Sequence, residues 1–398
     1  MMKLAPRVLV LVSCLTVPTT FVPAADQGGP GFVDLNFAHA ASQYTQMLAG
    51  LRNDPGLPRT IDEKGKVVTV APEDWTSGFF PGCLWLIYEH TRDDTWKQRA
   101  TDYTTRLEAL KTYGGTHDLG FMLGCSYGQG YRITQESAWR DVLITGAHTL
   151  AGRFSEKTGC IRSWDFGPWQ FPVIVDNMMN LELLTWASRE SGEQSLLNVA
   201  LTHADTTEKH HFRPDSSSFH LVDYHPDTGA VLKKQTVQGA ADGSAWARGQ
   251  AWALYGYTAM FRETREPDYL ARAAAVADFF LGHPRLPADG VPYWDFDAPG
   301  IPDVPRDSSA AAITSSALFE LAGFVEPERA AVYRAFAVKQ LRSLASPAYR
   351  AGVGANGGFI LMHATGHHPE GREIDVPLVY GDYYFLEALT RFDALLKR

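Results

Sequence analysis

Hydrophobic and polar positions repeat along the chain in a way that predicts pairs of helices. In each copy an apolar helix ends in a polar turn, and an acidic or hydroxyl residue then opens a second helix. In one such second helix Tyr269, Ala273, Val276 and Phe280 fall on a single apolar stripe at helical spacing. Copies of the pattern span residues 88–107, 131–154, 187–207, 261–281 and 322–344.

The helix before each polar turn is more apolar than the helix after it, as in residues 78–88 and 250–261. A helix that is apolar on most sides is a buried one. Alternating buried and half-buried helices predict an all-α toroid, an (α/α)6 barrel, whose sixth pair is opened by residues 37–51. An open solenoid is the alternative, but it requires polar capping repeats that are not evident here. Short β segments are expected at 159–166 and 218–231, around turn-forming residues.

The start of the chain has the pattern of an export signal. A basic N-terminus precedes an apolar run over residues 8–17, and small residues follow at 24–25. We expect a signal peptide over 1–25, one catalytic domain over 30–398, and a periplasmic or secreted protein. The apolar run is too short to span a bilayer, so stable membrane insertion is not expected. Lipoprotein anchoring at Cys14 is a minor alternative.

The amino-acid composition indicates which classes of molecule the protein can bind. The formal net charge of -9 gives nucleic acid no basic surface to bind. Ten Trp residues are many for this length, and indole faces beside polar residues suit stacking against sugar rings. Beyond the signal peptide Cys83, Cys125 and Cys160 are widely spaced, odd in number and without paired His. They predict buried thiols, and neither a disulfide framework nor a structural zinc site.

Four polar clusters interrupt the apolar inner helices, at residues 74–78, 116–120, 175–180 and 244–252. Each cluster precedes or opens a helix. Because the inner helices of a toroid run parallel, their N-terminal ends meet at one rim. The sequence therefore predicts that the four clusters form one site.

Asp118 and Asp176 are the candidate working carboxylates. Asp118 taken alone could be a helix N-cap. Asp176 lies between the apolar stretches 173–175 and 178–179, so it should be buried and needs a partner or a raised pKa. Two carboxyl groups facing one cleft should differ in pKa, which leaves one protonated as a general acid. Such a pair is typical of glycosidases, but it names neither the sugar nor the choice between hydrolysis and lysis.

Three further positions stand out near these clusters. His220 lies in a β-like stretch, where a structural role is the simpler interpretation. Arg248 opens a helix of small residues flanked by Trp, and a buried guanidinium requires an anion. Trp246 and Trp252 are six residues apart and need not share a face, so one of them can belong to the core.

Five stretches, in order along nearly the whole chain, resemble the unsaturated glucuronyl hydrolases, glycoside hydrolase family 88. They are DWTSGFFPGCLWLIYEHT, THDLGFML, VDNMMNLELLTWAS, GAADGSAWARGQAWALYGY and DVPLVYGDYYFLEALTR. The family fold is an (α/α)6 barrel. Its members remove 4,5-unsaturated glucuronic acid from the non-reducing end of oligosaccharides produced by lyases. The resemblance implies that an acid protonates C4 of the vinyl ether, water adds at C5, and the hemiketal then opens.

The resemblance also implies roles for individual residues. Asp176 is expected to be the acid and base, and Asp118 the second carboxylate, which helps to hold the substrate and sets the pKa of its neighbour. Neither a metal nor an organic cofactor is implied, and the expected partner is an unsaturated uronate-containing oligosaccharide. The implied substrate-binding residues are Trp75, Trp164, His220, Gln238, Trp246, Arg248 and Trp252, so His220 moves from a structural to a site residue.

Two alternatives remain at this level. One is an unsaturated rhamnogalacturonyl (galacturonyl) hydrolase with the same fold and chemistry, and the other is a non-catalytic uronide-binding protein. The neighbouring sugar and its sulfation also stay open. Residues 346–396 contain no Lys, and Arg350, Arg372 and Arg391 are their fixed positive charges, so a demand for sulfate is not indicated. Residues 365–368 could supply neutral donors instead.

Overall fold

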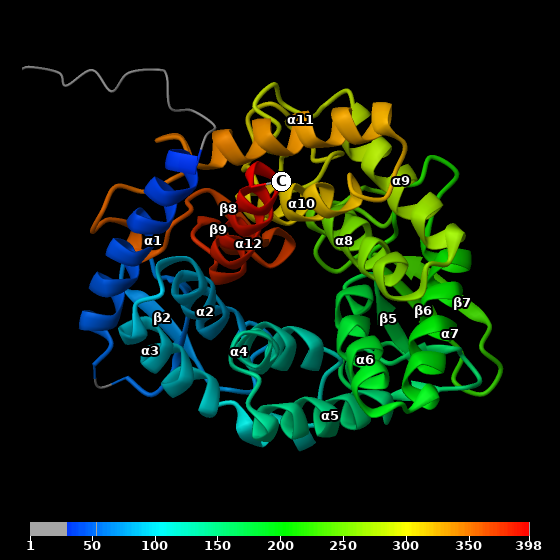
Figure 1. Cartoon of the computed structure of the whole chain (residues 1–398). Helices are drawn as coiled ribbons and strands as arrows, with labels where there is room; N and C mark the ends of the chain where they lie inside the picture. The colour runs from blue at the N-terminus through cyan, green and yellow to red at the C-terminus, as the bar shows by residue number, and fades with distance from the viewer. Residues whose placement is uncertain (1–29, 53, 398) are drawn as a thin grey trace, which may run out of the picture.

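Helices arranged in pairs around a ring make up most of the structure (Figure 1). The computed structural model describes residues 30–52 and 54–397, and the expected signal peptide over 1–25, with Cys14, lies outside them. The inner helices are α2 (Phe79–Thr91), the π-helix η3 (Gly120–Gly128) continued by α4 (Gln129–Thr134), α6 (Asn177–Ser191), α8 (Ala247–Thr264), α10 (Ser308–Leu321) and α12 (Val379–Leu396). Their outer partners are α3 (Asp94–Thr105), α5 (Ser137–Ala151), α7 (Gln194–His211), α9 (Pro267–Gly282), α11 (Pro327–Leu344) and α1 (Pro30–Gly50). The predicted (α/α)6 barrel is confirmed.

The ring is closed by the two ends of the described chain. Consecutive inner helices pack against one another, and α12 packs against α2 to complete the circle. The outer partner of α12 is α1, at the blue end of the colour range in Figure 1. The segment 37–51, expected to open a sixth pair, therefore lies in a helix whose inner partner comes last in the chain. A closed ring needs no capping repeats, which excludes the open solenoid.

Burial follows the predicted difference between inner and outer helices. In α2 every residue from Phe79 to Ile87 is buried. The outer helix α3 instead buries one stripe, Trp96, Ala100, Tyr103 and Thr104, and leaves the rest of its surface to solvent. The hydrophobic pattern of each helix thus predicts whether the helix lies in the inner or the outer ring of the barrel.

A buried carboxyl group ties the closing pair together. Asp382 in α12 accepts hydrogen bonds from the Tyr44 hydroxyl of α1 at 3.0 Å and from the backbone N–H groups of Ile360 and Leu361 at 2.8 and 2.9 Å. Burial raises the pKa of Asp382 to about 7 although these donors lower it. The side chain therefore joins the first helix, the last helix and the loop before it.

Short strands lie on the connections that lead into the inner helices. They are β1 (Leu57–Ile61) with β2 (Val67–Val70), β3 (Phe154–Ser155) with β4 (Cys160–Ile161), the antiparallel sheet β5 (Pro172–Ile174), β6 (Leu221–Tyr224) and β7 (Val231–Gln235), and β8 (Ala364–His367) with β9 (Arg372–Val376). Short helical turns are η2 (Glu108–Thr112), η4 (Asn356–Gly358) and η5 (His368–Glu370). The β segments expected at 159–166 and 218–231 are present as β4 and as β6 with the start of β7. Because each set precedes an inner helix, the strands gather at the rim where those helices begin.

The remaining expectations about the core concern the cysteines and the membrane. Cys83, Cys125 and Cys160 are buried free thiols, as predicted, and burial raises the pKa of each. In the part of the chain that the structure describes, no helix combines the length and apolar character needed to cross a bilayer.

Candidate active site

The polar clusters converge at the rim formed by the N-terminal ends of the inner helices. Asp118 stands two residues before η3, Asp176 occupies the N-cap of α6, and Trp246 occupies the N-cap of α8. The side chain of Asn180 connects two of these ends, because its Oδ1 accepts from the backbone N–H of Phe121 at 2.9 Å while its own helix starts at Asp176. The predicted meeting of the clusters at one rim is confirmed.

Asp176 holds its carboxyl group in an unusual state for a helix N-cap. The side chain makes no capping hydrogen bond and is only 7% exposed. Its Oδ2 has no hydrogen-bond partner among the described residues, and the Nε2 atom of His220 lies 3.7 Å away. Burial raises the pKa of Asp176 to about 7, with Arg248 opposing the rise and Asp118 adding to it. A buried carboxyl with a free oxygen and such a pKa is a candidate proton donor.

Asp118 is not the helix cap that its position allowed. Its backbone carbonyl accepts from Met122 at 2.9 Å, whereas its carboxylate accepts from the Thr116 hydroxyl at 2.7 Å. Burial raises its pKa to about 7 although the Thr116 hydroxyl lowers it. The sequence predicted different pKa values for the two carboxyls. Burial raises the pKa of each to about 7, and the charge of Asp118 raises the pKa of Asp176 further, so the two groups titrate as a coupled pair. The two groups also differ in their hydrogen bonds. The Thr116 hydroxyl donates to the carboxylate of Asp118, whereas Oδ2 of Asp176 has no partner among the described residues.

Each carboxyl faces a buried, neutral imidazole. His220 accepts at Nδ1 from the backbone N–H groups of Val237 at 3.0 Å and Gln238 at 3.3 Å, so its proton is on Nε2, toward Asp176. His117 lies 3.4 Å from Asp118 through its Nε2 atom. Burial lowers the pKa of both imidazoles to about 3, so both stay uncharged near neutral pH. His220 therefore lies beside Asp176, and its role in substrate binding stays a prediction. His117 is a second imidazole, beside Asp118, that the sequence did not predict for the site.

Arg248 has its required anion within the protein itself. The guanidinium is 1% exposed and donates to Asp307 at 3.0 Å and to the backbone carbonyls of Thr365 and Gly366 at 2.5 and 2.7 Å. Its charge also lowers the pKa of Asp176. Only its Nε atom remains without a hydrogen-bond partner among the described residues. The carbonyl of Gly366 accepts from Gln238 as well, at 3.1 Å, so Gln238 lies beside Arg248, and its contact with a substrate stays a prediction.

The predicted tryptophans occupy different parts of this rim. Trp246 lies under the Arg248 guanidinium, with 4.5 Å from the charge centre to the ring, and 4.7 Å from the ring of His220. Trp252 is fully buried and lies near Asp176, whose pKa it lowers, although its N–H makes no hydrogen bond with a described residue. Its contact with a substrate stays a prediction. Trp75 is half-buried and packs 4.9 Å from the ring of Tyr380.

Trp164 belongs to a separate aromatic group on the loop between β4 and β5. Its ring stacks on Phe166 at 5.4 Å and meets Trp169 edge-on at 5.5 Å, and Phe166 is 70% exposed. The structure gives Trp164 no contact with the two carboxyl groups. Its place in the site stays a prediction. The neighbouring Ser163 supports it, because the Ser163 carbonyl accepts from the backbone N–H of His117, the residue before Asp118, at 3.1 Å.

Several residues that were predicted for the site carry a buried polar atom without a hydrogen-bond partner. Buried side-chain atoms normally have hydrogen-bond partners. Five of the residues predicted for the site nevertheless have one buried atom with no partner among the described residues: Asp176 Oδ2, His220 Nε2, Arg248 Nε, Trp164 Nε1 and Trp252 Nε1. A polar ligand would supply those partners.

Sequence reasoning missed the residues that hold this site in place. Asp307 is fully buried at the N-cap of α10, where it accepts from the backbone N–H groups of Ser309 and Ala310 and from Arg248. The sequence could have predicted Asp307 as an N-cap, because it directly precedes a helix of small residues. The ion pair of Asp307 with Arg248 could not be predicted from the sequence, because the two residues lie 59 positions apart. Among the described residues no group of three or more His, Cys, Asp or Glu is placed to hold a metal ion.

A ring of helix pairs that carries two buried carboxyl groups among indole faces at one rim is the arrangement of a carbohydrate-active enzyme. The family model Glycosyl Hydrolase Family 88 matches residues 59–279. An unsaturated glucuronyl hydrolase of Formosa agariphila is 50% identical over 343 residues, which is 85% of this chain and 85% of that protein. The chain belongs to Glycosyl Hydrolase Family 88 and is a glycosidase.

Further relatives agree in sequence and in structure. An unsaturated glucuronyl hydrolase of Bacillus sp. (strain GL1) is 34% identical over 348 residues, 84% of this chain and 90% of that protein. The crystal structure of an unsaturated glucuronyl hydrolase specific for heparin superimposes with a TM-score of 0.90 at 44% identity, over 93% of this chain and 99% of that chain. These likenesses support the barrel and the order of its elements.

The buried pair of Arg248 and Asp307 yields a stability prediction. Asp307→Ala leaves a buried guanidinium without its anion and should lower the free energy of unfolding by about 3–5 kcal/mol. Glu108→Ala removes an exposed partner of Lys111 and should change it by no more than about 1 kcal/mol. Denaturant unfolding followed by circular dichroism measures both changes. An Asp307→Ala effect as small as that of the control would show that the pair does not stabilise the barrel.

Proposed function

We propose that the protein removes 4,5-unsaturated glucuronic acid from the non-reducing end of oligosaccharides produced by polysaccharide lyases. The observation that carries the proposal is Asp176, a buried carboxyl at the rim that keeps its proton near neutral pH and has one oxygen free. The relatives named for this activity are up to 50% identical. A more distant structure, from a Streptococcus agalactiae enzyme at 28% identity and a TM-score of 0.76, is a complex with dGlcA-GalNAc6S.

The reaction that this site favours is addition of water to a vinyl ether. The Asp176 carboxyl gives its proton to C4, and the C4=C5 electron pair forms the new C–H bond. Water then adds its oxygen at C5 and returns a proton to the Asp176 carboxylate. The hemiketal so formed opens by breaking the bond from C5 to the ring oxygen, which gives a ketone at C5 and a hemiacetal at C1. The hemiacetal then becomes an aldehyde as its bond to the remaining sugar breaks, and that sugar leaves as an alcohol. One carboxyl therefore acts first as acid and then as base, which suits a pKa of about 7.

The groups around Asp176 suit an anionic, unsaturated ring. The free Nε–H of Arg248 and the Nε2–H of His220 are donors that do not lose their hydrogen near neutral pH. Charge-assisted hydrogen bonds in a dry pocket are strong, so Arg248 is proposed to bind the uronate carboxylate. Gln238, whose amide already donates to a carbonyl, is proposed to contact the ring through its oxygen.

Asp118 and the aromatic residues complete the proposed site. Asp118 is proposed to hold a sugar hydroxyl and, in its ionised form, to raise the pKa of Asp176. Trp75, Trp164, Trp246 and Trp252 are proposed as the walls around the substrate. The rhamnogalacturonyl alternative is not favoured, because the relatives described above are named for glucuronyl substrates.

A panel of unsaturated disaccharides tests the activity. Hydration destroys the C4=C5 chromophore, so the ultraviolet absorbance of glucuronyl disaccharides from heparin, chondroitin or hyaluronan should disappear on incubation. A rhamnose-linked unsaturated galacturonide is the control that separates the two related activities. Retention of absorbance with every glucuronyl substrate would contradict the proposal, and turnover of the galacturonide alone would transfer it to the rival substrate.

Substitution of the proposed acid gives the second test. Asp176→Asn removes the proton donor and should lower kcat/KM by about 10²–10⁴-fold. Asp223→Asn is the matched control, since Asp223 is equally buried at 7% but accepts from the backbone N–H groups of Gln170 and Phe171. In the unmodified enzyme kcat/KM should decline as pH rises above about 7, because the acid then loses its proton. If the Asp176→Asn variant kept its activity, another residue would have to donate the proton.

Export is proposed on the basis of the N-terminal pattern alone. The protein recovered from the periplasm or the medium of its producer should begin near residue 26, as read by N-terminal sequencing. A lipid-modified protein that begins at Cys14 would identify an anchored lipoprotein instead. Protein confined to the cytoplasm with Met1 retained would refute export.

A further inference from the structure

Ser163, on the connection between β4 and β5, joins the two segments that carry the carboxyl groups of the site. The residue is fully buried. Its backbone N–H donates to the carbonyl of Pro172 at 2.9 Å, which fixes it beside β5. Its backbone carbonyl accepts from the N–H of His117 at 3.1 Å, and His117 directly precedes Asp118. The backbone of Ser163 therefore holds the segment that carries Asp118.

The hydroxyl of Ser163 holds the start of α6. It donates to Oδ1 of Asn177 at 2.7 Å and accepts from the backbone N–H of Ile174 at 3.0 Å. Asn177 is the buried first residue of α6 and directly follows Asp176. The amide of Asn177 also donates to the carbonyl of Ile161 at 2.7 Å, so both ends of its side-chain amide are bonded. The Ser163 hydroxyl is thus a direct link to the residue next to Asp176.

Asn180 makes a second connection between the same two segments, one turn further along α6. Its amide nitrogen lies 3.4 Å from Nδ1 of His117. The segments approach closely here, because a Cβ added at Gly120 would meet Cα of Asn180 at 2.5 Å. Asn180 therefore joins the helices behind the carboxyl groups, whereas Ser163 contacts the residues adjacent to those groups in the sequence.

The two segments that Ser163 joins carry groups that repel each other when both are ionised. Asp118 raises the pKa of Asp176 through this repulsion. The other groups that act on the pair are the charged residues Arg248, Asp74 and Arg153 and the neutral imidazoles of His220 and His117. Without the link through Ser163 the repulsion would move the two carboxyls apart. A longer distance weakens the effect of each charge on the other.

We propose that Ser163 is a positioning residue of the hydration reaction, and that its hydroxyl holds Asp176 in place relative to Asp118. The inference rests on the proposed function, because it concerns the same proton transfer. In this role the hydroxyl acts through Asn177 and contacts neither the substrate nor the reacting atoms. It determines where the acid lies and at which pH the acid loses its proton.

Titration of the side-chain carboxyl carbons by NMR tests the inference without any substrate. In protein labelled at the Asp carboxyl carbon, the signal of Asp176 is assigned by its loss in Asp176→Asn. In Ser163→Ala this signal should titrate at a lower pH than in the unmodified protein, because a more distant Asp118 raises the pKa of Asp176 less. An unchanged titration of Asp176 in Ser163→Ala overturns the inference.

Ser315→Ala is the matched control for the loss of a buried hydroxyl. Ser315 is fully buried on α10 and donates to the Gln340 side chain of α11 at 3.1 Å. Its replacement likewise leaves a buried acceptor without a donor, but away from the two carboxyl groups. The titration of Asp176 and the turnover of substrate should therefore stay unchanged in Ser315→Ala. Denaturant unfolding of both variants measures how much stability each one loses.

Steady-state kinetics with an unsaturated glucuronyl disaccharide gives the second measurement. Ser163→Ala should lower kcat by about 10²-fold and leave KM nearly unchanged, because a displaced acid slows the chemical step rather than binding. The decline of activity with rising pH should also begin at a lower pH, since the acid loses its proton earlier. A kcat of Ser163→Ala equal to that of Ser315→Ala overturns the inference.

A double-variant cycle tests whether the hydroxyl acts through Asn177. Asn177→Ala removes the acceptor of the same hydrogen bond, so the loss of kcat in the double variant should be smaller than the product of the two single losses. Losses that multiply overturn the route through Asn177. If Ser163→Ala does not fold, the titration of Asp176 in Asn177→Ala decides the question. If the unmodified enzyme turns over no unsaturated disaccharide, the proposed function fails, and the carboxyl titration still decides whether Ser163 positions Asp176.

Discussion

The arrangement of the catalytic rim depends on one buried charge, the guanidinium of Arg248. A charge removed from water must be matched by an anion and by hydrogen-bond acceptors, or the fold loses several kcal/mol. Asp307 on α10 supplies the anion, and the carbonyls of Thr365 and Gly366 on β8 supply the acceptors. Two inner helices and the hairpin beside them are therefore held in one relative position. The same charge limits how far burial raises the pKa of Asp176, so it links the scaffold to the reacting group.

The features that could be predicted from the sequence are those that depend on neighbouring residues. The 3.6-residue period distinguishes inner from outer helices, because each helix shows its own degree of burial in its own composition. The position of polar clusters before helices then places them at one rim, because parallel helices start at the same end. The apolar residues on either side of Asp176 also revealed its burial. In each case the sequence within about twenty residues carries the physical cause.

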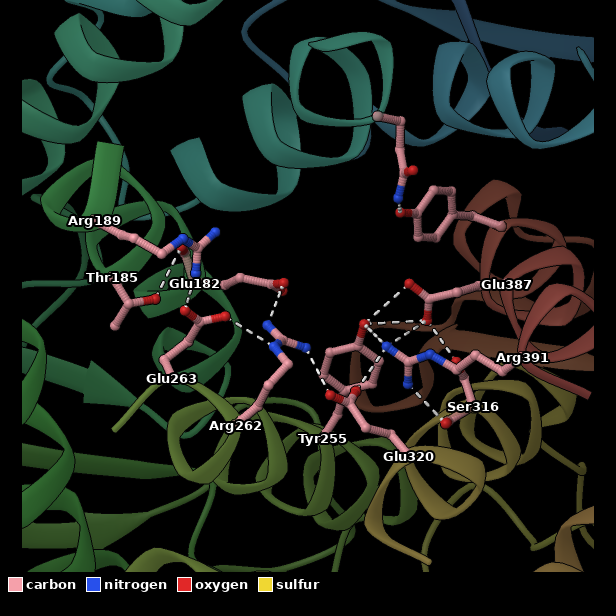
Figure 2. A network of polar contacts seen from close by, with 12 residues as sticks. Glu182, Thr185, Arg189, Tyr255, Arg262, Glu263, Ser316, Glu320, Glu387 and Arg391 are labelled. Atoms are coloured by element: carbon pink, nitrogen blue, oxygen red, sulfur yellow. Dashed lines mark hydrogen bonds and ion pairs between the residues drawn. The ribbon is translucent and has the colours of Figure 1, made fainter. Parts of the chain in front are cut away.

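The features that could not be predicted depend on contacts between distant segments. Nothing beside Arg248 in the sequence identifies Asp307 as its anion, and nothing near Asp382 indicates Tyr44. The raised pKa values of Asp118 and Asp176 likewise arise from burial by residues of the whole rim. The ion pairs that Arg262 makes with Glu182 and Glu320 likewise join separate inner helices, and in the sequence each of these residues resembles an ordinary solvated position (Figure 2). Only the packing of neighbouring inner helices brings them together.

Ring closure has a consequence for how this chain reaches its native state. Tyr44 and Asp382 meet across 338 positions of sequence, and α1 packs on α12. The entropic cost of closing so long a loop rises only slowly with length, but contacts of such separation form late. During synthesis α1 can pack early on α2, but the part of its apolar face that contacts α12 stays uncovered until the final helix has emerged. That interval is when the chain is most exposed to aggregation and proteolysis. Synthesis of α12 therefore determines when α1 is fully buried and protected from aggregation and proteolysis.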